Sequence, residues 1–333
     1  MSYIELDIEN LEETREKVRK VLLEQDKKIK EIGDRVEVHQ AEAKRSRKLF
    51  AVDSGFNTAY ETPFVVFKAA VVDEEMNVDH SGGICLFHVE NYQTDRLRRL
   101  LMQRTLYQAL ERSVEKGVAD GSMVLVDGTI TLTVFYPTSK DGKEYREHFK
   151  NLYERIYSPL TDQCHKRKIL LLGFLKRTGS TYLSEYLGVR GLYDIYIMGS
   201  ALKKNGDYIR PIPIIDTQAN SFDVSHRYVT FYLNLKGWNY RFELLEQQEI
   251  QFLECVQNLL FGATDAHYGM NPVSSKADEH ARVTKREANL TFNYMIHDLS
   301  ENDRTMLRLE ARKRTHFGYR SRSSKLLGRL SEG

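Results

Sequence analysis

Apolar residues near the start of the chain recur at helical intervals within a strongly charged segment, residues 9–32. Successive members of this stripe are separated by seven, four, seven and three positions. Such spacing predicts an amphipathic helix, and its narrow stripe suits either packing on its own domain or pairing in a dimer. The members of the stripe are Leu11, Val18, Leu22, Ile29 and Ile32.

Three short apolar runs with the composition of strands follow this segment. LFAV at residues 49–52 leads directly into Asp53, and PFVVFKAAVV (63–72) and ICLFHV (84–89) come next. The turn-rich stretch MNVDHSGG lies between the second and third runs, and its two glycines are expected to mark that turn. The runs therefore predict a meander whose first strand ends on a carboxylate.

A long helix and two further strands complete the pattern. The helix is expected from Thr94, an N-cap candidate, to about Gly117, a natural C-cap. The run SMVLVDGT (122–129) repeats the opening pattern by ending on Asp127 and a glycine, and ILLLGFLK (169–176) precedes a segment of helical spacing. We therefore expect an α/β fold with a ribonuclease H-like mixed-sheet core and helices on its faces. The N-terminal helix and additional C-terminal strands and helices would extend this core.

Composition indicates a globular protein with at least one substantial core, since 41% of the 333 residues are hydrophobic and 11% are aromatic. Lys and Arg number 49 against 47 Asp and Glu, so the formal charge of +2 indicates no class of partner. Cys85, Cys164 and Cys255 match no zinc or disulfide spacing, which favours a reducing compartment. Without a signal peptide or an apolar run of membrane-spanning length, a soluble cytoplasmic protein without membrane contact is expected.

Carboxylates occupy three positions where apolar packing alone would favour other residues. In a ribonuclease H-like sheet the ends of the first and fourth strands lie side by side, which would bring Asp53 and Asp127 together. Glu111 lies in the middle of the apolar face of the helix between them, and Glu115, about 40° away around the helix, is the alternative. For either aspartate alone, a turn capped by its own side chain is the competing interpretation.

Three carboxylates gathered in this way would repel one another unless a cation neutralised them. Oxygen ligands select hard ions such as Mg²⁺ or Mn²⁺, and the Cys/His spacing that zinc requires is missing from the sequence. Two such ions, bridged by a carboxylate, can activate water and stabilise the leaving oxygen of a phosphodiester. The pattern therefore indicates nuclease chemistry.

Several longer motifs resemble the NurA nucleases, the partners of the HerA-type hexameric DNA translocase. The resemblance spans about residues 45–290 of this chain. The motifs that carry it are FAVDSGF, MVLVDGTI, LLGFLKRTGS (171–180), YRFELL (240–245) and GMNPVSSKADEHARVTKRE (269–287).

This resemblance implies an activity and a set of site residues. The activity would be that of a 5′ to 3′ exonuclease with single-strand endonuclease activity, a preference for Mn²⁺ and two ions per site. The protein would be a homodimer that acts with a HerA-type ATPase in DNA end resection and double-strand break repair. Lys176 would stabilise phosphate charge, and His280, with His267 as its rival, would complete the site. The family's metal ligands would correspond to Asp53, Glu111, Asp127 and His280.

Basic clusters at residues 44–48, 165–168 and 312–329 offer contacts for DNA phosphates, and the last includes the stacking candidates Phe317 and Tyr319. The alternative for the last cluster is a tail that docks a partner protein. No phosphate loop of the GxxxxGK[ST] type occurs, so any ATPase motor would be a separate protein. The predicted organisation is an N-terminal helical region (1–45), a nuclease domain (46–311) and a basic tail (312–333).

Two other functions are compatible with the same residues. An RNA-directed ribonuclease could share this fold, because three acids do not distinguish one sugar from the other. A non-catalytic adaptor of a DNA translocase is the alternative from another class, although its intact acids would then have no catalytic role.

Overall fold

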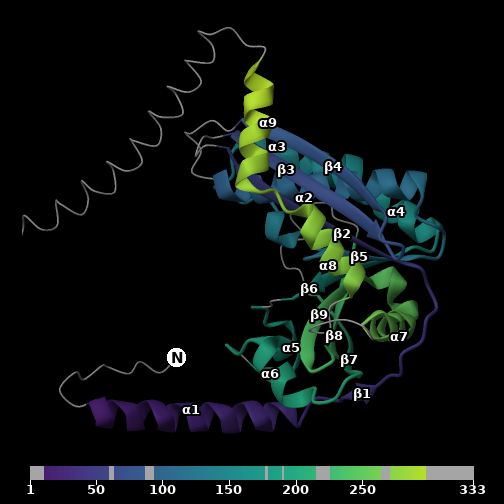
Figure 1. Ribbon diagram of the computed structural model, residues 1–333. Helices are drawn as coiled ribbons and strands as arrows, with labels where there is room; N and C mark the ends of the chain where they lie inside the picture. The colour runs from purple at the N-terminus through teal and green to yellow at the C-terminus, as the bar shows by residue number, and fades with distance from the viewer. Residues whose placement is uncertain are drawn as a thin grey trace, which may run out of the picture. The chain divides into compact units, whose positions relative to one another are not determined.

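The computed structural model describes residues 11–59, 64–86, 94–176, 179–189, 191–214, 226–263 and 271–297 (Figure 1). The chain divides into two compact units, each of which combines strands and helices. The first unit comprises residues 1–47, 128–131 and 170–272, and the second comprises residues 48–127, 132–169 and 273–333. Two features predicted from the sequence, His267 and the basic tail at 312–333, lie outside the described residues.

The sheet of the second unit has the strand order of a ribonuclease H-like core. Its strands are β2 (Leu49–Thr58), β3 (Phe64–Asp73), β4 (Val78–Leu86) and β5 (Met123–Asp127), in the order β5-β2-β3-β4. β2 pairs in parallel with β5 and antiparallel with β3, which in turn pairs antiparallel with β4. α2 (Thr94–Lys116) lies between β4 and β5 in the chain, so the fold class predicted from the sequence is confirmed.

α2 covers one face of this sheet and has the ends that the sequence predicts. Leu100, Tyr107 and Val114 on its inner side have no exposed surface. Ser113 Oγ donates a hydrogen bond of 3.2 Å to Asp79 Oδ2 on β4, which fixes the last turns of the helix to the sheet. The apolar stripe of α2 is therefore the contact surface that its periodicity predicts.

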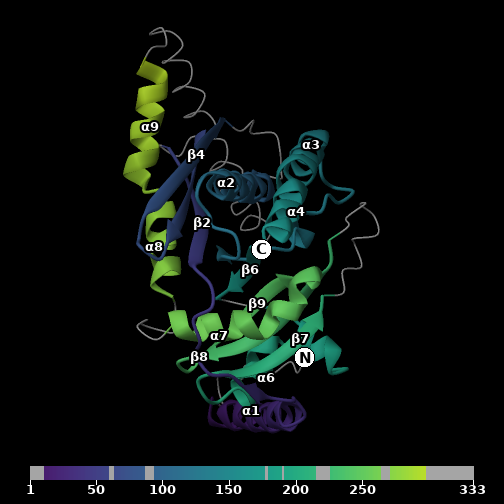
Figure 2. The ribbon, with the colours of Figure 1, turned by 90° about the vertical axis from the view of Figure 1, so that its right-hand side faces the viewer.

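The other helices of the second unit lie on both sides of β2 and β4. α3 (Lys143–Leu152) and α4 (Ser158–Lys166) lie on the same side as α2 (Figure 2). α8 (Pro272–Ala281) and α9 (Lys285–His297) lie on the opposite side in the same view. This second side becomes important because it carries the candidate site.

β2 differs from its predicted boundary, since it does not end on Asp53 but continues to Thr58. The parallel pairing with β5 stops at Val52, whereas the antiparallel pairing with β3 goes on to the end of the strand. The small and polar residues after Asp53 hide this continuation, because apolar alternation is lost while the backbone ladder persists. Asp53 therefore lies in mid-strand, directly beyond the end of the parallel pairing.

The turn between β3 and β4 is also displaced from its predicted position. Asp73 Oδ1 accepts hydrogen bonds from the backbone N–H groups of Glu75 and Asn77, at 3.0 and 2.9 Å, and these close a turn over residues 74–77. The Gly82–Gly83 pair, predicted at this turn, lies within β4 and pairs with β3. A capping aspartate is thus the stronger turn signal here, because its side chain satisfies two backbone donors.

The first unit contains an antiparallel sheet with the strand order β1-β7-β8-β9-β6. β8 and β9 form a hairpin through Lys236 and Gly237, whose φ angles of 52° and 88° are those that a two-residue hairpin loop requires. The strands are β1 (His39–Gln40), β6 (Leu170–Leu175), β7 (Asp207–Pro213), β8 (Tyr228–Leu235) and β9 (Trp238–Leu245).

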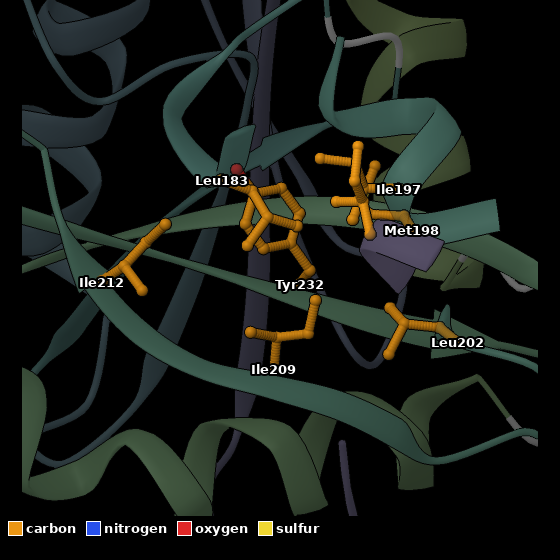
Figure 3. Packing of buried hydrophobic residues seen from close by; sticks show 8 residues of the cluster. Leu183, Ile197, Met198, Leu202, Ile209, Ile212 and Tyr232 are labelled. Carbon is orange, nitrogen blue, oxygen red and sulfur yellow. The ribbon is translucent and has the colours of Figure 1, made fainter. Parts of the chain in front are cut away.

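Helices of the first unit pack on this sheet through a buried apolar cluster (Figure 3). In this cluster Tyr232 of β8 lies among side chains from α5 (Tyr182–Tyr186) and α6 (Asp194–Ala201). Outside this cluster, α7 (Phe252–Gly262) packs on the sheet through Phe252, whose ring centroid lies 5.0 Å from that of Phe231. The labelled members of the cluster are Leu183, Ile197, Met198, Leu202, Ile209, Ile212 and Tyr232.

α1 (Leu11–Gly33) buries only part of its predicted stripe. Ile32, near the end of the helix, is 4% exposed and belongs to the cluster of Figure 3, whereas Leu22 is 58% exposed. The helix therefore packs on its own unit through its C-terminal end, and a role of the remaining stripe in a dimer stays a prediction. None of the described helices, α1 included, has the length and apolarity that crossing a membrane requires.

Candidate metal centre

The parallel pairing of β2 with β5 places two aspartates beside each other. The register ends with Val52 opposite Val126, so Asp53 and Asp127 are the next residues on the two strands. The four residues before each aspartate are buried, with exposed fractions of 6% or less. These apolar runs hold both strands in the core and thereby fix the positions of the two carboxylates.

A third aspartate reaches the same place from α8. One carboxylate oxygen from each of Asp53, Asp127 and Asp278 lies within 4.8 Å of the other two. The side chain of Asp278 is 49% exposed, and its Oδ2 lies 3.7 Å from Nη2 of Arg282. We call these three aspartates the carboxylate cluster.

Gly55 of β2 allows α8 to approach the strand closely. Gly55 lies two residues after the first aspartate of the cluster and therefore on the same face of the sheet. A Cβ atom at this position would lie only 2.8 Å from the carbonyl oxygen of Ala281 at the end of α8. Asn57 Nδ2 also donates a hydrogen bond of 3.0 Å to the carbonyl of Val283. The end of α8 is thus held against β2, with Asp278 one turn earlier in the helix.

Replacing Gly55 by alanine is expected to displace α8 and weaken metal binding. The contact is with a backbone carbonyl, which no side-chain rotation can relieve, and overpacking of this kind costs about 1–3 kcal/mol. Calorimetric titration should show a lower affinity for Mn²⁺, and thermal unfolding a lower midpoint. Gly83→Ala on β4 is the matched control, because its added Cβ has no atom within 4 Å. Wild-type Mn²⁺ affinity in Gly55→Ala would contradict this role for Gly55.

The carboxylate cluster has the chemistry of a site for hard divalent cations. Three ionised carboxylates at such short separations destabilise one another, and a bound cation removes this repulsion. The backbone N–H of Ser54 donates a hydrogen bond of 2.6 Å to Asp53 Oδ1, which helps to hold that carboxylate in place. A donor set made only of oxygen atoms suits Mg²⁺ or Mn²⁺ better than zinc. The carboxylate cluster therefore fits the hard divalent cation that the sequence predicts.

Glu111 is half-buried on α2 and is not a member of the carboxylate cluster. Burial raises the pKa of Glu111, the nearby Glu115 carboxylate raises it further, and Arg112 opposes this shift. A raised pKa favours the protonated acid, and a carboxyl group must lose its proton before it can bind a metal ion. The metal-ligand role of Glu111, with the exposed Glu115 as the alternative, stays a prediction.

The other two residues implied by the family resemblance also lie outside the cluster. Lys176 follows β6 in the first unit, with its Nζ 5.7 Å from the ring centroid of Phe174. His280 lies on α8, and its ring centroid is 5.4 Å from that of His80 on β4. Their catalytic roles stay predictions.

Asp278 is the residue that the sequence interpretation missed. It lies two positions before His280 in α8, where the buried side chains include Ala277 and Ala281. At about 100° per residue, Asp278 and His280 lie on opposite sides of this buried face, each about 80° around the helix from its centre. Helical periodicity therefore could not choose between them, and only the approach of α8 to β2 identifies the aspartate.

A buried ion pair in the first unit holds the segment that follows Asp127. Glu243 of β9 has no exposed surface, and its Oε1 accepts a hydrogen bond of 2.6 Å from Arg241 Nη2. Its Oε2 accepts hydrogen bonds from Thr129 Oγ1 at 2.6 Å and from the backbone N–H of Ile130 at 3.0 Å. A buried charge is tolerated only with such partners. Glu243 therefore fixes the backbone that begins directly after the second metal-ligand candidate.

Comparison with known proteins agrees with the fold described above. The family model of the NurA domain matches residues 47–283. The NurA nuclease from Sulfolobus solfataricus has a crystal structure that superposes with a TM-score of 0.66 at 16% identity, over 88% of this chain and 97% of that chain. A crystal structure of NurA bound to dAMP and manganese has a TM-score of 0.59 at 12% identity, over 89% and 99% of the two chains. At these identities the two structures show a shared fold. Among curated proteins, no sequence matches this chain.

Proposed function

This chain belongs to the NurA family of metal-dependent nucleases, and we propose that it hydrolyses the phosphodiester bonds of DNA at the carboxylate cluster. The observation that carries the proposal is the convergence of Asp53, Asp127 and Asp278 within 4.8 Å of one another. In a solved NurA structure manganese is bound together with dAMP, which supports Mn²⁺ as the metal here, with Mg²⁺ as the alternative. Two ions per site are proposed.

In this proposal the aspartates hold the metal ions, and other residues act on the substrate. Bound divalent ions would supply the positive charge that activates water and stabilises the leaving oxygen. Asp53 and Asp127 are fixed by buried strands, so they would present their oxygens with little reorganisation. Lys176 would stabilise phosphate charge, and Glu111 would complete the ligands. The family resemblance gives a further ligand position to His280, whereas the carboxylate cluster gives it to Asp278, which is the residue proposed here.

The finer activity follows the family resemblance. We propose 5′ to 3′ exonuclease activity on DNA ends with single-strand endonuclease activity, in a homodimer located in the cytoplasm. A HerA-type ATPase would act with it in DNA end resection and double-strand break repair, because the sequence lacks a phosphate loop for an ATPase of its own. The domain organisation proposed for this role is an N-terminal helical region (1–45), a nuclease domain (46–311) and a basic tail (312–333).

A time course on end-labelled linear DNA tests the activity. Cleavage is expected with Mn²⁺, absent with chelator, and faster with the cognate ATPase. Asp53→Ala should abolish cleavage while leaving the fold intact, because Asp53 is a half-buried ligand rather than part of the apolar core. Asp162→Ala is the matched control, since Asp162 is an exposed residue of α4, which lies on the α2 side of the sheet. Full activity of Asp53→Ala at saturating Mn²⁺ would refute the assignment.

Two further measurements separate the alternatives. Matched RNA and DNA oligonucleotides test the ribonuclease alternative, and preferential cleavage of RNA would replace the proposed substrate. Calorimetric Mn²⁺ titration of the wild type and of Asp127→Ala tests the adaptor alternative. A protein that neither cleaves nor binds Mn²⁺ would be the adaptor.

A further inference from the structure

The face of the sheet that carries Asp53 also carries a lysine and a histidine without a role in the proposed chemistry. Across the antiparallel strands, Asp53 lies opposite Ala70, which lies opposite His80. Lys68, two residues before Ala70, lies on the same face because side chains alternate along a strand. Lys68 and His80 therefore lie on the α8 side of the sheet, one and two strands away from the cluster aspartate.

Lys68 has little side-chain cover in its own row of the sheet. It lies opposite Gly55 on β2 and opposite Gly82 on β4. Neither glycine provides a side chain, although the carbonyl of Ala281 occupies the space beside Gly55. The side chain of Lys68 is 29% exposed, so part of it is accessible from solvent.

The positive charge of Lys68 is only loosely compensated. Its Nζ lies 3.5 Å from Glu287 Oε1 at the start of α9. Glu287 is already engaged in the N-cap of that helix, because its Oε2 accepts a hydrogen bond of 2.7 Å from the backbone N–H of Thr284. Partly exposed ion pairs of this kind contribute about 0–1 kcal/mol to stability. The ion pair with α9 therefore stabilises the fold too little to account for a lysine at this position.

His80 lies close to the same lysine and is accessible from solvent. Its ring is exposed and packs at 5.4 Å, centroid to centroid, against that of His280 on α8. An imidazole has at least one N–H that can donate a hydrogen bond, whether it is neutral or charged.

We propose that Lys68 and His80 bind a backbone phosphate of the nucleic-acid strand, next to the phosphodiester held at the carboxylate cluster. This inference rests on the proposed nuclease function. A lysine ammonium is a compact charge that binds phosphate oxygens without reading sequence, and the imidazole N–H adds a directed donor. The subsite would hold the strand along the α8 face of β2, β3 and β4 and align the scissile bond with Asp53.

The test is DNA binding as a function of salt, measured by anisotropy of a labelled single-stranded oligonucleotide with chelator present to prevent cleavage. For Lys68→Gln the dissociation constant should rise about tenfold, the usual scale for one charged contact. The slope of log affinity against log salt should fall by about 0.7, the value for one phosphate contact to a single strand. His80→Asn should weaken binding with a smaller change of slope. Lys68→Arg should keep both affinity and slope close to the wild type.

Two controls distinguish a phosphate contact from a structural ion pair. Lys143→Gln removes a lysine whose Nζ lies 3.7 Å from Glu147 Oε1, and because α3 lies on the α2 side of the sheet, binding should be unchanged. Glu287→Gln releases Lys68 from its carboxylate and should strengthen DNA binding. A structural pair would instead give Lys68→Gln and Glu287→Gln the same effect.

An unchanged salt slope in Lys68→Gln, or weaker DNA binding in Glu287→Gln, would overturn the subsite. If Lys68→Gln does not fold, the responses of Lys68→Arg and Glu287→Gln decide. Wild-type cleavage with Mn²⁺ separates the two levels of inference. A wild type that cleaves DNA while Lys68→Gln keeps its slope refutes the subsite alone, whereas a wild type that does not cleave refutes the proposed function.

Discussion

Replacing Asp278 by asparagine is expected to lower the rate of DNA cleavage at limiting Mn²⁺ by at least about a hundredfold. Asparagine keeps the size of the side chain but removes the charge and one anionic ligand. Losing a residue that merely orients a metal ligand typically costs about ten- to a hundredfold in affinity or activity, so losing a ligand should cost no less. Initial rates over a Mn²⁺ titration measure this effect.

The same substitution should affect stability in opposite directions with and without metal. Without metal, Asp278→Asn removes one of three mutually repelling charges, so the midpoint of thermal unfolding should be maintained or raised. With Mn²⁺, the wild type gains stability in proportion to how tightly it binds the ion, and the variant should gain less. An increase of the midpoint with Mn²⁺ equal to that of the wild type would contradict the role assigned to Asp278.

His280→Asn is the matched comparison because the residue lies two positions further along the same helix. Its ring packs against His80 rather than joining the carboxylate cluster, so Mn²⁺ binding should be close to that of the wild type. If His280 were the ligand, the two variants would exchange their effects. The pair of titrations therefore decides between the residue implied by the family resemblance and the residue that the structure places beside Asp53.

The part of the site formed by adjacent strands could be predicted from the sequence. The apolar runs before Asp53 and Asp127 identify two buried strands, and the order of elements requires these strands to be neighbours. Backbone pairing then determines the rest, because the residues after Val52 and Val126 are adjacent once the register is set. Local pattern and topology lead to the same answer at this point.

The contribution of α8 could not be predicted in the same way. Asp278 joins the cluster only because the helix end approaches β2 to within contact of Gly55, and this depends on tertiary packing between segments more than 200 residues apart in the chain. Gly55 carries the relevant signal, but in the sequence it reads as part of a turn after Asp53. Burial likewise does not identify Glu111 as a ligand. Burial raises the pKa of Glu111, and a protonated glutamate is tolerated half-buried on an apolar face without any metal.

Replacing Glu243 by alanine is expected to cost about 3–5 kcal/mol of folding stability, because it leaves the buried guanidinium of Arg241 without its carboxylate. The backbone N–H groups of Ile130 and Thr131, at 3.0 and 3.3 Å from Oε2, would lose their acceptor as well. Unfolding in urea or by heat measures the loss. A cost below about 1 kcal/mol, the scale of an exposed ion pair, would show that the pair does not organise this region.

Glu243→Gln separates the two functions of this carboxylate. A glutamine can turn its oxygen toward Thr129, Ile130 and Thr131, which keeps the backbone anchors, but its amide then faces Arg241 Nη2 donor to donor. The folding stability of Glu243→Gln should therefore lie between those of the wild type and Glu243→Ala. The anchored segment begins directly after Asp127, so the folded glutamine variant should bind Mn²⁺ almost as well as the wild type. Any folded alanine variant should require a higher Mn²⁺ concentration for the same activity. Equal Mn²⁺ requirements in the two variants would mean that anchoring residues 128–131 has no influence on the metal ligand.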